Sequence, residues 1–228
     1  TGLLRKHAIC NAYAKYKPGK DQEINLDVDY LARNQVNYQH VSSKDYNADK
    51  QNTGNDLILN NHSPSKIEAT VAKLDYSAKL KDDLQIEAGA KYSVSHTDNG
   101  AYFERRDNNG NWQPDATRTN DFIYRENINA VYANATRDWG KQWQTQLGLR
   151  LENMHAEGKE LTQGQAFMRN NTSLFPTLFA SYKMDEHNSI ELNCGRRVNR
   201  PAYTQLIPFF YYFSQYNFFK GNPDLMAS

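Results

Sequence analysis

The amino-acid sequence predicts an all-β fold: an antiparallel up-and-down meander of about eight long strands. Two observations predict it. Apolar and polar residues alternate with a period of two in several stretches, which fits a strand better than a helix. The connections between these stretches are alternately short and long. The expected strands are residues 6–17, 22–40, 66–80, 84–96, 122–137, 142–156, 174–184 and 189–199.

The alternation is clearest in residues 84–96, where one face is apolar and the other is polar or small. The apolar face consists of Leu84, Ile86, Ala88, Ala90, Tyr92 and Val94. In residues 66–80 the apolar phase changes between Val71 and Ala72, which predicts a β-bulge at that point. Residues 174–184 carry apolar side chains on both faces and a proline, Pro176, so the pattern there does not decide which face is apolar.

The connections favour a membrane-spanning barrel wall over a soluble sandwich. Tight polar turns are expected at 17–21, 80–84, 138–142 and 184–188, and long excursions at 41–65, 97–120, 156–173 and from Pro201 onward. Outer-membrane barrels have short periplasmic turns, long outer loops and strands that alternate between lipid-facing apolar and lumen-facing polar residues. About 9–11 residues are needed to span the bilayer, and most of the expected strands reach that length. A soluble sandwich or solenoid remains the alternative.

Composition narrows the functional classes. The 228 residues include 27 Lys+Arg and 26 Asp+Glu, a formal net charge of +1, so there is no basic excess of the kind that nucleic-acid binding favours. The sequence contains no apolar run of 18 residues and therefore predicts no transmembrane helix. The six histidines lack metal-ligand spacing, and no nucleophile or phosphate-loop motif occurs, so we expect no metal, no cofactor and no enzyme. Cys10 and Cys194 are expected to be isolated rather than bridged.

Aromatic residues make up 12% of the chain although its mean hydropathy is −0.86. Several fall near the ends of expected strands, where aromatic girdles of membrane barrels lie. The residues expected in a girdle are Tyr13, Tyr16, Tyr76, Tyr132, Trp139, Trp143 and Tyr182.

Three stretches resemble the β-barrel domain of TonB-dependent outer-membrane receptors, in the variety common in Bacteroidetes. They are RENINAVYANATRDWGKQWQTQLGLRLENMHAEG (125–158), FPTLFASYKMDEHNSIELNCGRRVNRPAYTQLIPFFYY (175–212) and KGNPDL (220–225). The family's recurring patterns are Gly-Leu-Arg-x-Glu, Arg-x-x-Arg-Pro-x-Tyr and Gly-Asn-Pro-x-Leu. The resemblance therefore assigns structural roles to the matching residues, which are Gly148, Arg150, Glu152, Arg197, Arg200, Pro201, Gly221, Asn222 and Pro223.

The resemblance implies a place in a plugged barrel of about 22 strands in the bacterial outer membrane. Such a barrel imports a scarce or bulky ligand, such as a metal chelate, a vitamin or a glycan. Residues 1–228 would then be a single partial barrel domain and an internal fragment, without a plug domain. The implied partners are outer-membrane lipid, the remaining strands and plug of the parent protein, and a TonB-type energy-coupling protein that contacts the missing N-terminal part; no nucleic acid is expected. Exposed strand edges also predict edge-to-edge self-association.

Two other functions stay open at this point. One is a soluble or surface-exposed, Tyr-rich β module that binds glycans, and the other is a passive porin-type barrel. In either a receptor or a glycan-binding module, the excursions would supply the ligand contacts, because aromatic rings beside arginine suit stacking and polar recognition. The candidates are Tyr102, Phe103, Arg105, Arg106, Trp112, Tyr211, Tyr212 and Phe218. Loops that merely pack their own aromatic residues are the alternative.

The arginines near the C-terminus are divided between the faces of the last expected strand. Gly195 and Arg197 are expected on the polar, lumen-facing phase with Glu191. Arg196 and Arg200 are expected on the opposite phase, near the outer end of the strand, where a charge reaches headgroups or water.

Overall fold

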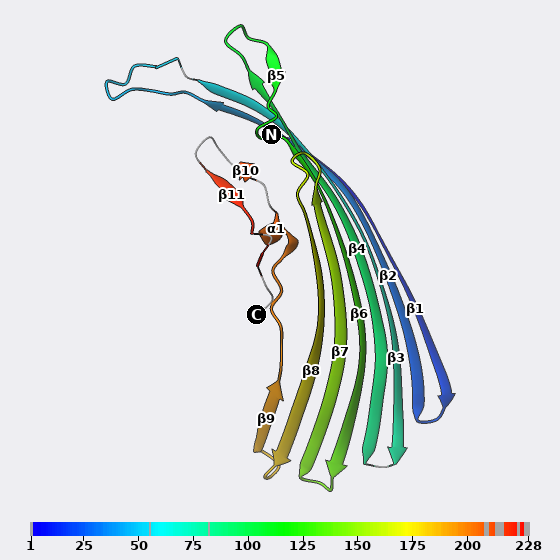
Figure 1. The fold of residues 1–228 in the computed structure, drawn as a ribbon. Coiled ribbons are helices and arrows are strands. Elements are labelled where there is room, and N and C mark those ends of the chain that lie inside the picture. The colour runs from blue at the N-terminus through cyan, green and yellow to red at the C-terminus, as the bar shows by residue number, and fades with distance from the viewer. Residues whose placement is uncertain are drawn as a thin grey trace.

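The computed structural model describes residues 2–54, 56–81, 83–207, 210–212, 217–222 and 224–225. These residues form one curved antiparallel sheet, a small separate hairpin and one short helix (Figure 1). The strands of the sheet are β1 (Gly2–Gly19), β2 (Gln22–Ser43), β3 (Leu57–Lys81), β4 (Leu84–Arg106), β5 (Trp112–Pro114), β6 (Asn120–Trp139), β7 (Trp143–Glu160), β8 (Ala166–Lys183) and β9 (Ser189–Gly195). The helix is α1 (Tyr203–Leu206), and the hairpin is β10 (Phe210–Tyr212) with β11 (Phe218–Lys220).

The predicted meander is confirmed. The long strands follow one another in the order β1-β2-β3-β4-β6-β7-β8-β9, and the short β5 pairs with the end of β4. The tight turns all lie at one end of the sheet and the long connections at the other (Figure 1). Within the described residues the sheet does not close, because β1 pairs only with β2 and β9 only with β8. No helix in the described part of the chain is long and apolar enough to cross a membrane.

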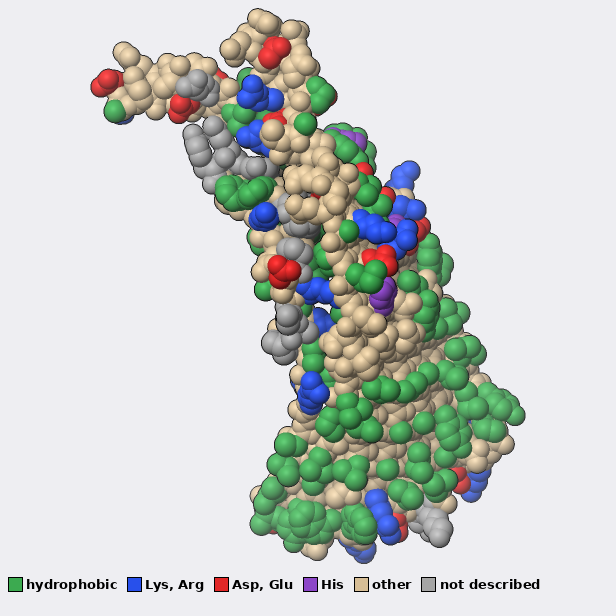
Figure 2. All heavy atoms as spheres, viewed as in Figure 1, with side chains coloured by type: hydrophobic (Ala, Val, Ile, Leu, Met, Phe, Trp, Pro, Cys, Tyr) green, Lys and Arg blue, Asp and Glu red, His purple; other side chains and the backbone are tan. Residues whose placement is uncertain are grey.

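The two faces of the sheet differ. We call the face that contacts α1 the inner face and the opposite one the outer face. Near the tight turns the outer face carries rows of exposed apolar side chains, which cover the lower half of the molecule in Figure 2. The strand register places one such row across six strands: Leu26, Leu74, Ala90, Val131, Leu151 and Leu174. Exposed apolar rows on a sheet of this length are the surface that lipid covers in a barrel.

Farther from the turns the polarity of the faces inverts on β3, β6 and β7. On β3 the outer face changes to Thr70, Glu68 and Lys66, while the inner face carries Val71 and Ile67. No bulge occurs there, because the β2–β3 register is unbroken from Gln22↔Ala78 to Ser43↔Leu57. The predicted bulge between Val71 and Ala72 is therefore wrong. The apolar phase changes because the strand leaves the lipid, so that its outer side chains meet water and its inner ones become packed.

This inversion also explains why the strands are longer than predicted. β3 begins at Leu57 rather than residue 66, β4 extends to Arg106 rather than residue 96, and β8 begins at Ala166 rather than residue 174. Their outer portions lack the apolar-out, polar-in alternation by which the membrane-spanning portions were identified. Above the lipid a strand still completes its hydrogen-bond ladder, but its hydropathy pattern is no longer that of a membrane strand.

The aromatic girdle is confirmed for five of the predicted residues, which lie on the outer face near the turns: Tyr16, Tyr76, Trp139, Trp143 and Tyr182. The rings of Trp143 and Tyr182 are 4.5 Å apart between centroids. Tyr13 and Tyr132 lie on the inner face instead, so that part of the prediction is wrong. The Tyr13 hydroxyl donates to Asn25 at 2.8 Å, and the Tyr132 hydroxyl donates to Asp75.

Candidate functional site

The chain leaves the sheet after Gly195 and crosses the inner face. β9 ends four residues earlier than predicted, and its last pair with β8 is Thr177↔Gly195. The Arg196 N–H still donates to the Pro176 carbonyl at 3.2 Å, but the ladder does not continue. Pro201 has no N–H and a fixed φ, so it cannot extend a paired strand. Residues 196–207, which we call the return segment, therefore turn toward the concave side of the sheet, where α1 lies in Figure 1.

An ion-pair triad attaches the return segment to β7. Arg150 and Glu152 are two residues apart on β7 and so share the inner face. Arg150 Nη2 donates to Glu152 Oε2 at 2.7 Å, and Arg200 Nη2 donates to Glu152 Oε1. Glu152 is only 5% exposed, and a buried carboxylate is stable only when charged donors satisfy it. The expectation that Arg200 lies on the outer phase is wrong, because the strand ends before it and its side chain meets Glu152.

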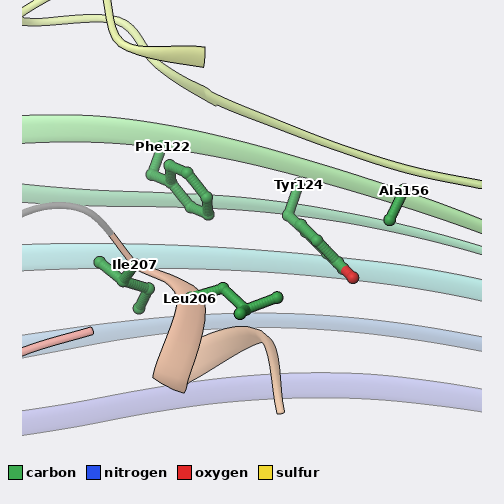
Figure 3. Close-up of a cluster of buried hydrophobic side chains, with 5 residues drawn as sticks. All are labelled: Phe122, Tyr124, Ala156, Leu206 and Ile207. Atoms are coloured by element: carbon green, nitrogen blue, oxygen red, sulfur yellow. The ribbon is translucent and has the colours of Figure 1, made fainter. Parts of the chain in front are cut away.

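A buried apolar cluster holds α1 against the sheet. Leu206 and Ile207 pack against Phe122, Tyr124 and Ala156, which come from β6 and β7 (Figure 3). Phe122 is fully buried and Leu206 is 2% exposed. Burying apolar side chains of this size contributes about 1.5–3 kcal/mol each, so the cluster stabilises the docked segment considerably.

One polar contact joins α1 to β4, and a second lies beneath the helix on β6. The Tyr203 hydroxyl accepts a hydrogen bond from Asn99 Nδ2 at 3.0 Å. The Tyr124 hydroxyl donates to Glu126 Oε2 at 2.9 Å. Burial is the main reason that the pKa of Tyr124 is raised above its ordinary value, so this phenol stays a hydrogen-bond donor at neutral pH.

The Gly-Asn-Pro stretch contacts the helix α1. The Asn222 N–H donates to the Gln205 carbonyl at 2.7 Å. A Cβ on Gly221 would lie 2.5 Å from the same carbonyl oxygen, so only glycine allows this approach. Pro223 lies outside the described residues. Of the other residues given structural roles, Gly148 packs between the side chains of Asn134 and Thr177, and Arg197 is exposed beyond the end of β9.

A cavity of about 760 Å³ lies between the return segment and β6–β8. Its lining includes Tyr124, Glu126, Arg169, Asn171 and Arg200. Pockets of 300–1,000 Å³ are the size that takes small molecules, and guanidinium, amide, carboxylate and phenol groups suit a polar ligand with ring or chelate character. Among the described residues no group of three or more His, Cys, Asp or Glu could hold a metal ion. The arrangement is suited to binding.

The residues predicted to contact ligand do not form one site, although Arg106 and Trp112 pair with each other on the β4–β5 hairpin. Tyr102 and Phe103 are neighbours on β4 and so point to opposite faces, and Phe103 is buried against Leu57, Leu59 and Ala101. Arg106 donates from Nε to the Gly110 carbonyl at 3.1 Å within the β4–β5 turn. Arg105 and Trp112 lie exposed on the same hairpin. Phe218 packs on Phe210 with ring centroids 5.0 Å apart, and the side chains of Tyr211 and Tyr212 lie outside the described residues.

Sequence reasoning missed the docked segment. Its signal was present in two places: the apolar pair Leu206-Ile207 follows the strand-ending Pro201, and the inner positions of residues 122–124 are aromatic where a wet lumen would predict polar groups. Each stretch looked like part of a loop or a strand, and only the contact between them shows a buried cluster.

An antiparallel meander with an apolar outer band, an aromatic girdle beside its tight turns and a polar rim is the wall of an outer-membrane β-barrel. The chain belongs to the outer membrane protein beta-barrel family, whose sequence model matches residues 17–228. Its place is accordingly the bacterial outer membrane. A search of curated proteins finds no match to this sequence.

Among the solved structures with a similar fold are three TonB-dependent receptors. The ferric citrate transporter FecA in its unliganded form matches with a TM-score of 0.63 and 14% identity over 85% of this chain and 27% of that chain. The ferric yersiniabactin uptake receptor FyuA from Yersinia pestis matches with a TM-score of 0.58 and 13% identity, over 81% of this chain and 27% of that chain. The siderophore receptor PiuA from Acinetobacter baumannii matches with a TM-score of 0.62 and 18% identity, over 83% of this chain and 32% of that chain. At these identities the likeness shows the fold, and this chain spans about a third or less of each structure.

Proposed function

We propose that the chain forms part of the barrel wall of a TonB-dependent outer-membrane receptor that imports a scarce or bulky ligand, with a metal chelate as the first candidate. The observation that carries the proposal is the docked return segment. It covers the inner face in the half of the sheet away from the tight turns and forms one side of the cavity of about 760 Å³. A segment docked on the inner wall gives a receptor a binding surface and a narrowed entrance.

The fold neighbours support this proposal, because their names describe transport or uptake of ferric citrate and ferric yersiniabactin and reception of a siderophore. The ordered motifs in residues 125–225 support the Bacteroidetes-type receptor in particular. The partners in this proposal are a plug that fills the complete barrel and a TonB-type protein that supplies energy. The exposed apolar band argues against the soluble glycan-binding module, since such a surface in water promotes aggregation.

Uptake measurements test the proposal. The complete reading frame that encodes the chain is expressed in the outer membrane of hosts with and without functional TonB, and uptake of labelled ferric chelates, cobalamin and oligosaccharides is followed. A receptor takes up one of these classes only in the host with TonB. Uptake of small solutes that is equal in both hosts would identify a porin and overturn the proposal.

The matched pair Arg200→Ala and Arg196→Ala ties the uptake to the return segment. Arg200 bonds the buried Glu152, whereas Arg196 is exposed and its side chain donates to the Leu174 carbonyl at 3.4 Å. Arg200→Ala should reduce TonB-dependent uptake, and Arg196→Ala should leave it near the wild-type rate.

A further inference from the structure

Three aromatic rings form a ladder on the outer face, across three neighbouring strands. Tyr38 of β2 pairs in register with His62 of β3, which pairs with Tyr102 of β4. The ring centroids of Tyr38 and His62 are 4.9 Å apart with an interplanar angle of 27°. Those of His62 and Tyr102 are 6.0 Å apart at 28°. All three side chains are exposed, and none of them faces the lumen.

The ladder lies well above the lipid band. On β2 the outer face carries Ala32, Asn34 and Val36 between Tyr30 and Tyr38. On β4 the last apolar residue on the outer face before the ladder is Val94, eight residues from Tyr102. At about 3.4 Å per residue this is about 27 Å along the strand, or about 20 Å along the membrane normal for a tilt of roughly 40°.

On β3 and β4, titratable side chains occupy the interval between the lipid band and the ladder. They are Lys66, Glu68, His96 and Asp98, all on the outer face. This is the composition expected where a strand passes lipid headgroups, and Figure 2 shows charged and histidine side chains above the apolar band. The ladder therefore stands at the height of the sugars that the outer leaflet of a bacterial outer membrane displays.

The residue next to Tyr38 on β1 has no side chain. It is Gly2, which pairs with Tyr38 across the β1–β2 ladder. The ladder borders a hollow of about 500 Å³, whose rim carries hydrogen-bonding groups of His40, Asn60 and Glu104. His40 Nδ1 and Asn60 Oδ1 are 2.8 Å apart. Rings beside amide and carboxylate groups match a sugar, whose C–H face lies on an aromatic ring while its hydroxyls bond to the rim.

We propose that the Tyr38–His62–Tyr102 ladder binds a sugar ring of the core oligosaccharide of the surrounding lipopolysaccharide. Three features favour this occupant over an imported ligand or a lipid phosphate. The ladder faces away from the lumen, it lies above the apolar band on β4, and two carboxylates adjoin it, Glu104 on the rim and Asp121, which accepts from the Tyr102 hydroxyl at 3.2 Å. The site fixes the receptor to its own membrane and acts independently of import.

Binding to the complete, delipidated barrel protein in detergent tests the site. Trp112 reports on it, because its ring lies 6.2 Å from that of His40 on the rim. Core oligosaccharide released from lipopolysaccharide is titrated against wild type and Trp112→Phe, and the difference between the two fluorescence signals isolates Trp112. Saturable quenching by the core oligosaccharide, and none by lipid A without core sugars, is expected. Equal responses to both would place recognition in the lipid A part and overturn the proposal.

Substitutions separate the ladder from its surroundings. Tyr38→Ala should weaken oligosaccharide binding about five- to tenfold, the loss typical of one aromatic contact. Gly2→Leu should weaken it similarly, because it places a side chain beside Tyr38 without removing a group from the structure. Tyr46→Ala, at an exposed tyrosine in the β2–β3 connection, is the control and should bind as wild type. Unchanged binding in both Tyr38→Ala and Gly2→Leu would overturn the proposal.

Discussion

The loss of unfolding free energy in Leu149→Arg measures how strongly lipid disfavours a charge on the outer face. The outer-face residues of β7 in the apolar band run from Trp143 to Leu151, about 27 Å along the strand and about 20 Å along the normal. Leu149 lies about 5 Å from the middle of this band and is 50% exposed, so its free surface meets lipid. Arginine near the midplane costs about 2–4 kcal/mol of unfolding free energy, whereas near an interface the cost is about 0–1 kcal/mol.

Asn153→Arg is the matched control, because residue 153 lies on the same strand and the same face just beyond the band. Reversible denaturant unfolding of the complete barrel in phospholipid vesicles, followed by tryptophan fluorescence, gives the free energy for each variant. Leu149→Arg should lose about 2–4 kcal/mol, and Asn153→Arg no more than about 1 kcal/mol. Equal losses would refute the assignment of the outer face to lipid.

Three further predictions concern the inner face and the turns. Glu152→Gln weakens the contact with Arg200 and should lower the free energy of unfolding in denaturant by about 1–3 kcal/mol. This is less than for a fully buried pair, because the arginines are partly exposed. Unchanged stability, with a return segment as resistant to protease as in wild type, would contradict the triad. Gly148→Ala should cost about 1–3 kcal/mol, because its Cβ overlaps two neighbouring side chains, whereas Gly195→Ala, whose Cβ meets its nearest atom at 3.4 Å, should be tolerated. A side-chain amide and then backbone N–H groups of its turn hold the pKa of Asp185 below its ordinary value of 3.8. The contribution of Asp185 to the stability of its turn is therefore present above pH 3.8 and is lost as the pH falls below that value. NMR of the turn amides should show this loss, and Asp185→Asn should abolish the pH dependence.

The membrane-spanning part of the fold was predictable because a single rule acts on it. Between the turns and residues such as Leu26 or Leu151, lipid on one side and a wet lumen on the other impose strict alternation on each strand. Turn chemistry then marks the near ends of the strands. The far ends were not predictable, because beyond the lipid the outer face is polar and the inner face is packed.

The error at Val71 shows the physical reason most clearly. A change of apolar phase has two causes, a bulge or a change of surroundings, and the sequence of one strand does not distinguish them. Only the unbroken pairing with β2 decides for the second cause. The inner-face site was hidden for a related reason, because Glu152 and Arg200 are 48 residues apart and their contact depends on how the return segment folds.

Nitroxide scanning of β7 in the complete, membrane-inserted barrel tests the central claim, that this sheet is a barrel wall which crosses lipid near its turns and rises into water beyond it. Single labels at residues 144–157 are compared for collision with oxygen, which partitions into lipid, and with a water-soluble nickel reagent. Residues 145, 147, 149 and 151 should collide with oxygen and their even-numbered neighbours should not. Residues 153, 155 and 157 should collide with the nickel reagent, while 154 and 156 beneath α1 should be protected from both. Loss of the two-residue alternation, or oxygen collision that continues through residue 157, would contradict the claim that the sheet crosses lipid near its turns and rises into water beyond it.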